Sequence, residues 1–233
     1  MVDEGTLLWK PSHETREHAQ VSRYLVWLRE SRGLTFASYD ELWRWSTGEI
    51  DAFWASVWDY FQVEGERGDG PVHEGEMPGT RWFPGARLNY AHLALRRRDD
   101  HPAVVFRNEA GDARTLSYAE LRREVARVAA GLRALGVGRG DRVAAYAPSL
   151  PETLITLLAA ASIGAVWSSC SPDFGASSVI DRFRQIEPKV LLAVDGYRYN
   201  GRTYDRSDVV RRIEGELPSV EATVLVPYLS ADA

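Results

Sequence analysis

Short apolar runs alternate with segments of helical periodicity throughout the part of the sequence that follows Ser117. The apolar runs begin near residues 142, 165, 190 and 223, and a helix-forming segment separates each run from the next. Strands that are separated by helices pair in parallel through right-handed crossovers. The sequence therefore predicts an α/β fold with a doubly wound, mostly parallel sheet, which should bind ligands at the carboxyl ends of its strands.

The first 65 residues have a different character and predict a helical N-terminal extension. We expect one helix that is capped by Ser12 and ends at Gly33. Two further helices should open with S-x-x-E boxes that start at Ser38 and Ser46.

Tryptophan is concentrated in this extension, because six of the eight tryptophans lie in the first 60 residues. On the third helix Trp54 and Trp58 belong to one wide aromatic stripe. We expect this stripe to pack as core, and a subunit interface is the alternative. Residues 64–87 are polar and rich in turn signals, which is typical of a surface connector. We therefore divide the chain into 1–81, the helical extension with its connector, and 82–233, the α/β part.

Several local signals place the remaining elements. We expect a short helix over about residues 88–98 and a β-hairpin around residues 108–112. Ser117 opens a third S-x-x-E box, and Ser149 is expected to cap the helix that follows it.

Composition and charge exclude several classes of protein. The chain has 28 basic and 33 acidic residues, a net charge of −5, which is too acidic for a general nucleic-acid binder. Its longest apolar stretch, 154–166, is shorter than the roughly 20 residues of a membrane span. The single cysteine excludes an intrachain disulfide. We expect a soluble protein of the reducing cytoplasm, without a nucleic-acid or membrane partner.

Familiar catalytic and nucleotide-binding motifs are missing from the sequence. The glycine-rich run 136–140 follows a helix and enters a strand, the reverse of the context that a dinucleotide-binding loop requires. Lys10 and Lys189, which are the only lysines, lack the preceding glycines of a P-loop. No nucleophile elbow, H-E-x-x-H motif or histidine pair with metal-ligand spacing occurs in the α/β part, so no metal site is expected.

Four small polar residues follow the apolar run at 165–167 and are expected to lie in a loop at the edge of the sheet. Ser168, Ser169 and Ser171 could donate hydrogen bonds to a phosphate or a carbonyl group, or could only form the turn and cap the next helix. Cys170 has no histidine nearby in sequence to activate it, so a small buried thiol is favoured over a nucleophile.

A second expected loop, 195–202, follows a buried strand and sets Arg198 and Arg202 among glycines and aromatic residues. Guanidinium groups on a flexible loop suit a phosphate ligand. The alternative is that both arginines are only solvated surface residues.

Four segments of the sequence carry a resemblance to a known family: residues 81–91, residues 116–121, residues 161–175, and residues 185–190 followed by 195–201. They resemble the acetoacetate–CoA ligase branch of the AMP-forming, acyl-adenylate superfamily, which also contains the acetyl-CoA synthetases. The serine-rich segment that ends in Pro-Asp-Phe-Gly is the most specific of them, because acetyl-CoA synthetases typically have paired glycines there.

The resemblance implies a two-step reaction with ATP, CoA and acetoacetate as substrates and Mg2+ on the phosphates. It implies that Arg198, Arg202, Asp173 and Gly196 bind CoA, although one extra residue separates the two arginines here. It also implies that 82–233 is the first subdomain of a larger adenylate-forming domain.

The family's lysine-containing phosphate loop and its C-terminal domain have no counterpart among the segments of this sequence that resemble the family. No catalytic residue is therefore expected in these 233 residues, which should need the C-terminal remainder of the enzyme to complete either half-reaction. A ligase for another short acid, such as acetate or propionate, is one alternative. A non-catalytic α/β module that binds a nucleotide or CoA is another.

Overall fold

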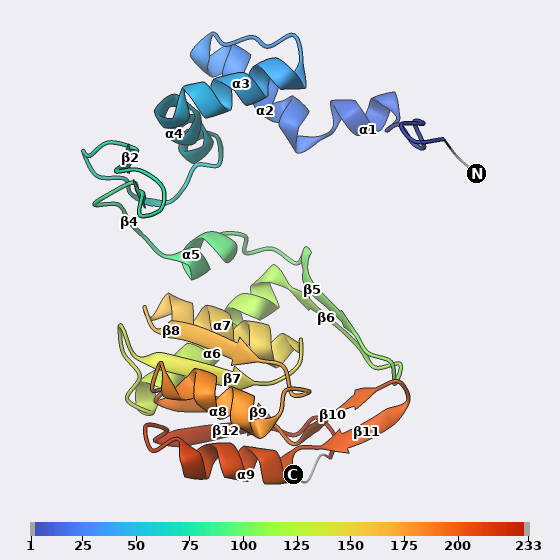
Figure 1. Ribbon diagram of the computed structural model, residues 1–233, viewed down its shortest axis with the longest axis vertical. Coiled ribbons are helices and arrows are strands. Elements are labelled where there is room, and N and C mark those ends of the chain that lie inside the picture. Colours follow the sequence, from blue (N-terminus) through green and yellow to red (C-terminus); the bar gives the residue numbers. More distant parts are fainter. Residues whose placement is uncertain (1–2, 231–233) are drawn as a thin grey trace. The chain divides into compact units, whose positions relative to one another are not determined.

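The computed structural model describes residues 3–230 and contains two compact units, which divide between Leu88 and Asn89 (Figure 1). The expected division after residue 81 falls just inside the first unit. Among the described residues, no helix is both long and apolar enough to cross a membrane. Each unit has its own core, and the two are described in turn.

Four helices make up most of the first unit, one more than expected. The single helix predicted between Ser12 and Gly33 is wrong, because the chain leaves the helical path at His18 and Ala19. Ser12 still caps the first piece and accepts a hydrogen bond of 3.0 Å from the Thr15 amide. The helices are α1 (His13–Glu17), α2 (Gln20–Arg32), α3 (Tyr39–Gly48) and α4 (Ile50–Tyr60).

Only one of the two predicted capping signals in this unit opens a helix. The Ser38 hydroxyl caps α3 by accepting a hydrogen bond of 3.2 Å from the Glu41 amide. The prediction for Ser46 is wrong, because its hydroxyl donates to the Trp43 carbonyl 2.8 Å away, within α3 itself. A serine inside a helix commonly bonds back to the preceding turn in this way. Helix α4 instead begins after Glu49 without a side-chain cap.

The core of the first unit forms where α2 meets α3 and α4. Leu28 is fully buried there, and Tyr24 places its hydroxyl 2.6 Å from the buried Ser56 hydroxyl. The expectation that the aromatic stripe of α4 is core is only partly correct: Trp54 remains 40% exposed, and Trp58 is half-buried against the Phe83 ring.

The expected surface connector contains two small antiparallel ladders. Strand β1 (Gly65–Glu66) pairs with β4 (Arg87–Leu88), and β2 (His73–Glu74) pairs with β3 (Arg81–Trp82). Each of these strands has only two residues, so this segment is mostly turn and irregular structure, as its composition indicates.

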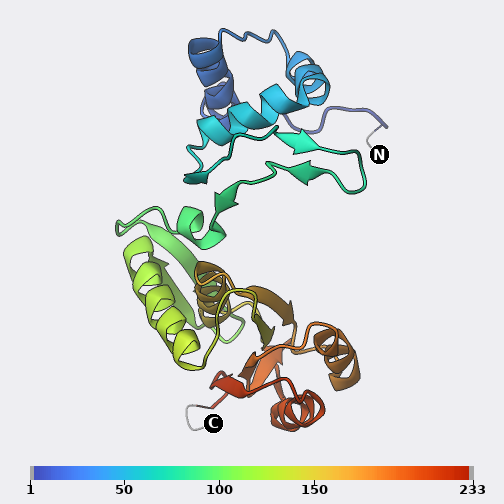
Figure 2. The ribbon, with the colours of Figure 1, turned by 90° about the vertical axis from the view of Figure 1, so that its left-hand side faces the viewer.

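The second unit confirms the predicted doubly wound α/β fold. Its four-stranded sheet has the order β12-β9-β7-β8, and every neighbouring pair is parallel. The strands are β7 (Arg142–Tyr146), β8 (Val166–Cys170), β9 (Val190–Val194) and β12 (Ala222–Val226). Figure 2 shows the sheet between α6 (Tyr118–Ala134) on one side and α8 (Ala176–Arg184) and α9 (Ser207–Glu216) on the other.

Alternate residues of β7 contribute to two apolar cores, one on each face of the sheet. Val143 packs with α6 and α7 (Pro151–Ser162), whereas Ala144 and Tyr146 pack with α8 and α9. Side chains of a strand alternate between the two faces of its sheet, and here helices cover both faces. The central strands are therefore apolar throughout, which is why they read as continuous runs in the sequence.

The elements that precede the sheet match most of the local signals. Strands β5 (Pro102–Arg107) and β6 (Ala113–Ser117) form the predicted hairpin, and Ser117 and Glu120 form a complete capping box at α6. Helix α5 (Tyr90–Ala94) is shorter than expected. The predicted cap at Ser149 is wrong, because α7 begins after Leu150 with a proline in its first turn and no side-chain cap.

The core of the first unit should depend on Leu28. Replacing it with alanine removes a fully buried side chain, and we expect the free energy of unfolding of this unit to fall by about 2–5 kcal/mol. Tryptophan fluorescence during denaturant unfolding measures this, since every tryptophan except Trp167 lies in the first unit. Val26→Ala on the same helix is the control, because Val26 is 44% exposed. Equal midpoints for the two variants would contradict this assignment of the core.

Candidate functional site

The carboxyl ends of the four parallel strands define the candidate site. Four segments of chain leave the sheet at this edge: the loop 171–175 after β8, the segment 195–205 after β9, the segment 227–230 after β12 and the segment 147–150 after β7 (Figure 1). The first two contain or adjoin all of the residues predicted to bind ligands. Side chains from the strand ends hold these segments in place.

Tyr146, the last residue of β7, fixes the loop after β8. The residue is completely buried, and its hydroxyl lies 2.7 Å from the Pro172 carbonyl oxygen and 2.9 Å from that of Phe174. Burial raises the pKa of the Tyr146 phenol to about 12, and the nearby Arg206 guanidinium opposes this shift only in part. The hydroxyl is protonated at neutral pH, and its single hydrogen, shared between the two carbonyl oxygens, ties the loop to the sheet.

The serine-rich segment lies differently from what we expected. Ser168 and Ser169 belong to strand β8, where they pair with Ala144 and Ala145 of β7, so their assignment to a loop is wrong. Pairing with β7 continues through both serines and so extends the strand to Cys170. Ser171 alone of the three serines lies in the loop.

None of the three serines caps the next helix, since Gly175 is the N-cap of α8 and has no side-chain bond. The loop prediction is also wrong for Cys170, which pairs with Tyr146 as the last residue of β8; its thiol is buried, and burial raises its pKa. A raised pKa disfavours the reactive thiolate, which fits the predicted structural thiol.

The expected flexible loop at 195–202 is a second β-hairpin, formed by β10 (Gly196–Tyr199) and β11 (Arg202–Asp205). Its turn residues, Asn200 and Gly201, both have positive φ values, 52° and 71°. This is the geometry of a two-residue hairpin turn of type I′, for which Asn-Gly is a strongly preferred sequence. The Asn-Gly pair was the signal in the sequence that could have predicted the hairpin.

The register of this hairpin separates the two arginines that are expected to bind CoA. Arg198 pairs with Thr203, whereas Arg202 pairs with Tyr199. Directly paired residues share a face of a hairpin and neighbouring residues alternate, so Arg198 and Arg202 lie on opposite faces. Both residues are exposed, and within residues 3–230 neither guanidinium forms an ion pair. The hairpin as it stands does not bring them together on one phosphate.

The tip of the hairpin rests on a carboxylate from the β5–β6 turn. Glu109 accepts hydrogen bonds from the amides of Asn200, at 2.9 Å, and Gly201, at 3.1 Å. Figure 1 shows the tips of the two hairpins meeting. This contact restrains the end of the segment that carries both arginines.

The base of the hairpin is connected to the loop after β8 by Arg206. Its Nε donates to the Pro172 carbonyl at 2.9 Å, and its Nη2 donates to the Tyr197 hydroxyl at 3.0 Å. The guanidinium also lies over the Tyr197 ring, which itself stacks on Tyr204. Arg206 was not among the residues singled out from the sequence.

Asp195 connects the base of the hairpin to the segment after β12. Its carboxylate is 5% exposed and accepts hydrogen bonds of 2.8–3.0 Å from the amides of Tyr228, Leu229 and Ser230. A buried carboxylate requires such compensation. The sequence signal was an aspartate directly after a buried strand, in a segment where only the two arginines and Gly196 are predicted to bind a ligand.

The two other residues expected to contact CoA have different surroundings. Gly196 is buried, and a Cβ at this position would overlap the Leu229 side chain and the Tyr204 carbonyl oxygen. Its visible role is therefore close packing at the base of the hairpin. Asp173 is exposed in the loop after β8. CoA binding by these two residues remains a prediction.

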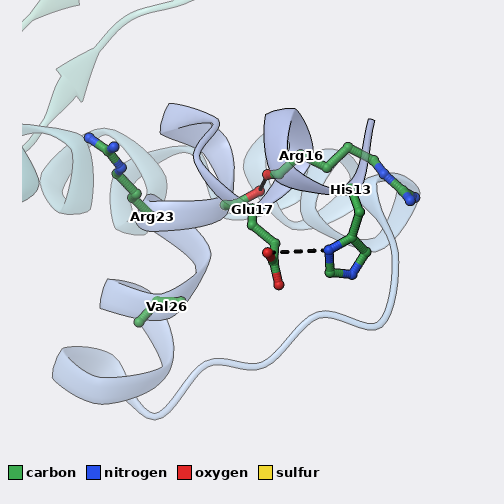
Figure 3. A pocket seen from close by; sticks show the side chains of 6 residues that line it. His13, Arg16, Glu17, Arg23 and Val26 are labelled. Carbon is green, nitrogen blue, oxygen red and sulfur yellow. Dashed lines mark hydrogen bonds and ion pairs between the residues drawn. The ribbon is translucent and has the colours of Figure 1, made fainter. Parts of the chain in front are cut away.

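Hollows elsewhere on the surface do not contain the predicted residues. In the first unit, His13 and Glu17, which are one turn apart on α1 and 3.2 Å from each other, help to line a hollow between α1 and α2 (Figure 3). In the second unit, a hollow of about 900 Å³ lies between α6, α7 and β12. Among the described residues no cluster of three or more His, Cys, Asp or Glu side chains could hold a metal ion.

Comparison with known proteins identifies relatives of both units. Residues 91–233 match the family model described as AMP-binding enzyme, and residues 39–94 match the one described as acetyl-coenzyme A synthetase N-terminus. An acetoacetyl-coenzyme A synthetase of Rhizobium meliloti (strain 1021) is 44% identical over 97% of this chain and 35% of its own length. A malonamoyl-CoA synthetase of Penicillium aethiopicum is 34% identical over 94% of this chain and 31% of its own length.

A solved structure supports the same relationship. The acetoacetyl-CoA synthetase from Streptomyces lividans superimposes with a TM-score of 0.89 and is 45% identical, covering 97% of this chain and 36% of that chain. The chain thus spans about a third of the length of the relatives that it matches.

Because the phenol of Tyr146 is buried, we expect the second unit to lose stability at alkaline pH. Its pKa is about 12 in the folded state against an ordinary value of 10.0, so between these pH values the folded state holds a proton that the unfolded state has lost. The free energy of unfolding is therefore fully retained below pH 10 and falls as the pH rises toward 12. We expect Tyr146→Phe to show a smaller alkaline loss.

Denaturant unfolding followed by circular dichroism at pH 8 and pH 11 tests this. At pH 8, Tyr146→Phe should itself lower stability by about 1–2 kcal/mol through the lost hydrogen bond. Tyr199→Phe is the control, because Tyr199 is 67% exposed. The same alkaline loss in wild type and in Tyr146→Phe would refute this assignment.

Proposed function

Because this chain belongs to the AMP-binding enzyme family, we propose that it is the N-terminal part of a ligase that joins acetoacetate to CoA. The observation that carries the proposal is the similarity, over nearly the whole chain, to proteins described as acetoacetyl-CoA synthetases. The segment with Ser168, Ser169 and Ser171 that ends in Pro-Asp-Phe-Gly supports the same choice.

The proposed reaction has two steps. A carboxylate oxygen of acetoacetate attacks the α-phosphorus of ATP, and the bond to pyrophosphate breaks. The CoA thiol, having lost its proton, then attacks the carbonyl carbon of the acyl-adenylate, and AMP leaves with the bonding electrons. Mg2+ enters as part of the ATP substrate, and since the described residues contain no metal-ligand cluster we assign none of them to it.

We propose that this part of the enzyme recognises CoA and does not itself carry the reacting groups. The hairpin presents exposed guanidinium groups beside the loop after β8, and such groups suit the negative charges of a CoA phosphate. The serine hydroxyls at the end of β8 and in the loop could donate hydrogen bonds to CoA or to the acyl-adenylate. The C-terminal remainder of the enzyme would supply the catalytic residues, in the cytoplasm, without a nucleic-acid or membrane partner.

A second candidate function is the same ligase reaction with a different acid as substrate. The malonamoyl-CoA synthetase is nearly as similar to this chain as several acetoacetyl-CoA synthetases, of which one from Macaca fascicularis is 35% identical. Similarity at this level therefore extends to a protein named for a different acyl group.

Assays with a panel of acids test the proposed function. The protein expressed from its complete reading frame should exchange pyrophosphate into ATP with acetoacetate, and form acetoacetyl-CoA only after CoA is added. Acetate, propionate and malonamate are the competing substrates, and we expect acetoacetate to give the highest kcat/KM. A higher kcat/KM for another acid would identify that acid, and not acetoacetate, as the preferred substrate. Exchange with none of the acids would favour the non-catalytic module.

The hairpin arginines provide a sharper test of CoA recognition. Because they lie on opposite faces, we expect one of the two variants, Arg198→Ala or Arg202→Ala, to raise the KM for CoA about tenfold or more. A charge-assisted bond to phosphate contributes about 1.5–3 kcal/mol, which is sufficient for this effect. Pyrophosphate exchange should not change, because it precedes CoA binding.

Dephospho-CoA, which lacks the 3′-phosphate, is the matched control for this prediction. The affected variant should lose its disadvantage when this substrate replaces CoA. If both variants discriminate between the two substrates as wild type does, the hairpin arginines are only solvated surface residues.

A further inference from the structure

The β10–β11 hairpin is not hydrogen-bonded into the main sheet. Its two strands form a separate two-stranded sheet, whereas β9, directly before it, belongs to the four-stranded sheet. Strand pairing therefore does not set the orientation of the hairpin. Contacts at its two ends must do so, and the contacts at the base are the ones nearest to the loop after β8.

We propose that Arg206 is a positioning residue for CoA binding, which fixes the arginine-bearing hairpin against the loop 171–175. This inference rests on the proposed function. Arg206 follows β11 directly and is half-buried, and its guanidinium donates to the loop through Pro172 and to the hairpin through Tyr197. One side chain thus joins the two segments that are expected to contact CoA.

The acceptor in the loop is itself held rigidly. The Pro172 carbonyl oxygen lies 2.7 Å from the Tyr146 hydroxyl and 2.9 Å from Arg206 Nε, so both groups converge on one atom. Tyr146 belongs to the central strand, and its burial is complete. The sheet therefore holds the Pro172 carbonyl in place through Tyr146. Arg206 binds this fixed carbonyl and the hairpin, and so restrains the hairpin relative to the sheet.

The geometry requires an arginine in particular. The guanidinium donates from Nε and from Nη2 to acceptors on different segments, and its centre lies 5.1 Å from the centroid of the Tyr197 ring. Lysine keeps the positive charge but has neither the planar fork nor the stacking surface. We therefore expect Arg206→Lys to behave like a loss of the contact rather than like wild type.

The expected effect is confined to CoA because of what the hairpin carries. Arg198 and Arg202 are its exposed cations, and the proposed function assigns them to a CoA phosphate. A hairpin without the Arg206 guanidinium contacts would still be restrained at its tip by Glu109 and packed at its base around Gly196, so it should shift rather than unfold. Such a shift would weaken binding of CoA and leave the preceding formation of the adenylate unchanged.

The test uses the protein expressed from its complete reading frame, with three variants. Arg206→Gln removes the positive charge of the side chain. Arg206→Lys keeps the charge but lacks the planar guanidinium group that reaches both acceptors. Arg211→Gln is the matched control, because Arg211 is exposed on the adjoining helix α9 and its ion pair within residues 3–230 is with Asp208 of that helix. We expect both Arg206 variants to raise the KM for CoA at least fivefold while pyrophosphate exchange stays within twofold of wild type.

Hydrogen–deuterium exchange provides a readout that does not depend on activity. Amides of residues 196–205 should exchange faster in Arg206→Gln than in wild type and in Arg211→Gln. Tyr197→Phe removes one acceptor and retains the ring, so its effect should be smaller and should not add to that of Arg206→Gln.

An unchanged KM for CoA in the Arg206 variants would overturn the inference, and so would an equal loss of pyrophosphate exchange and CoA-dependent turnover, since that indicates a general structural role. Unchanged amide exchange in the hairpin would overturn it as well. A wild-type protein without any pyrophosphate exchange would refute the proposed function itself, and with it the role of Arg206 in CoA binding.

Discussion

The burial of strand β7 on both of its faces is the constraint on which the second unit depends. Its backbone pairs with β8 on one side and β9 on the other, and Val143, Ala144, Ala145 and Tyr146 are all fully buried. A strand in this position needs helices above and below it, and parallel neighbours reach it only through crossovers. Both requirements bring the strand ends to one edge, and the candidate residues collect there as a result.

Buried and half-buried polar side chains, and not strand pairing, organise that edge. Tyr146 holds the loop after β8, Arg206 joins this loop to the hairpin, and Asp195 holds the segment after β12. Each satisfies backbone groups that lie outside the sheet, where no ladder can satisfy them. The apolar core thus sets where the edge lies, and a small set of polar contacts sets how its segments are arranged.

Much of the fold could be predicted because its signals are local. Strands β7 and β9 and the Ser117 box have the expected residues, since burial on both faces and helix capping leave clear patterns. The failures have tertiary or competing causes. Pairing with β7 draws Ser168 and Ser169 into a strand, and which face each hairpin arginine occupies depends on a register that composition does not reveal. The polar contacts at the site join residues far apart in the sequence and leave no periodic signal.

The contact between Glu109 and the hairpin turn has a consequence for the order of folding. It spans 91 residues to Asn200, whereas the Asn200–Gly201 turn needs only its immediate neighbours to close. Local turns form quickly, and contacts between distant residues carry a larger cost of loop closure. The hairpin can therefore acquire its shape early but its docked position only once the β5–β6 turn has formed, so the shape of the hairpin and its placement are separate folding events.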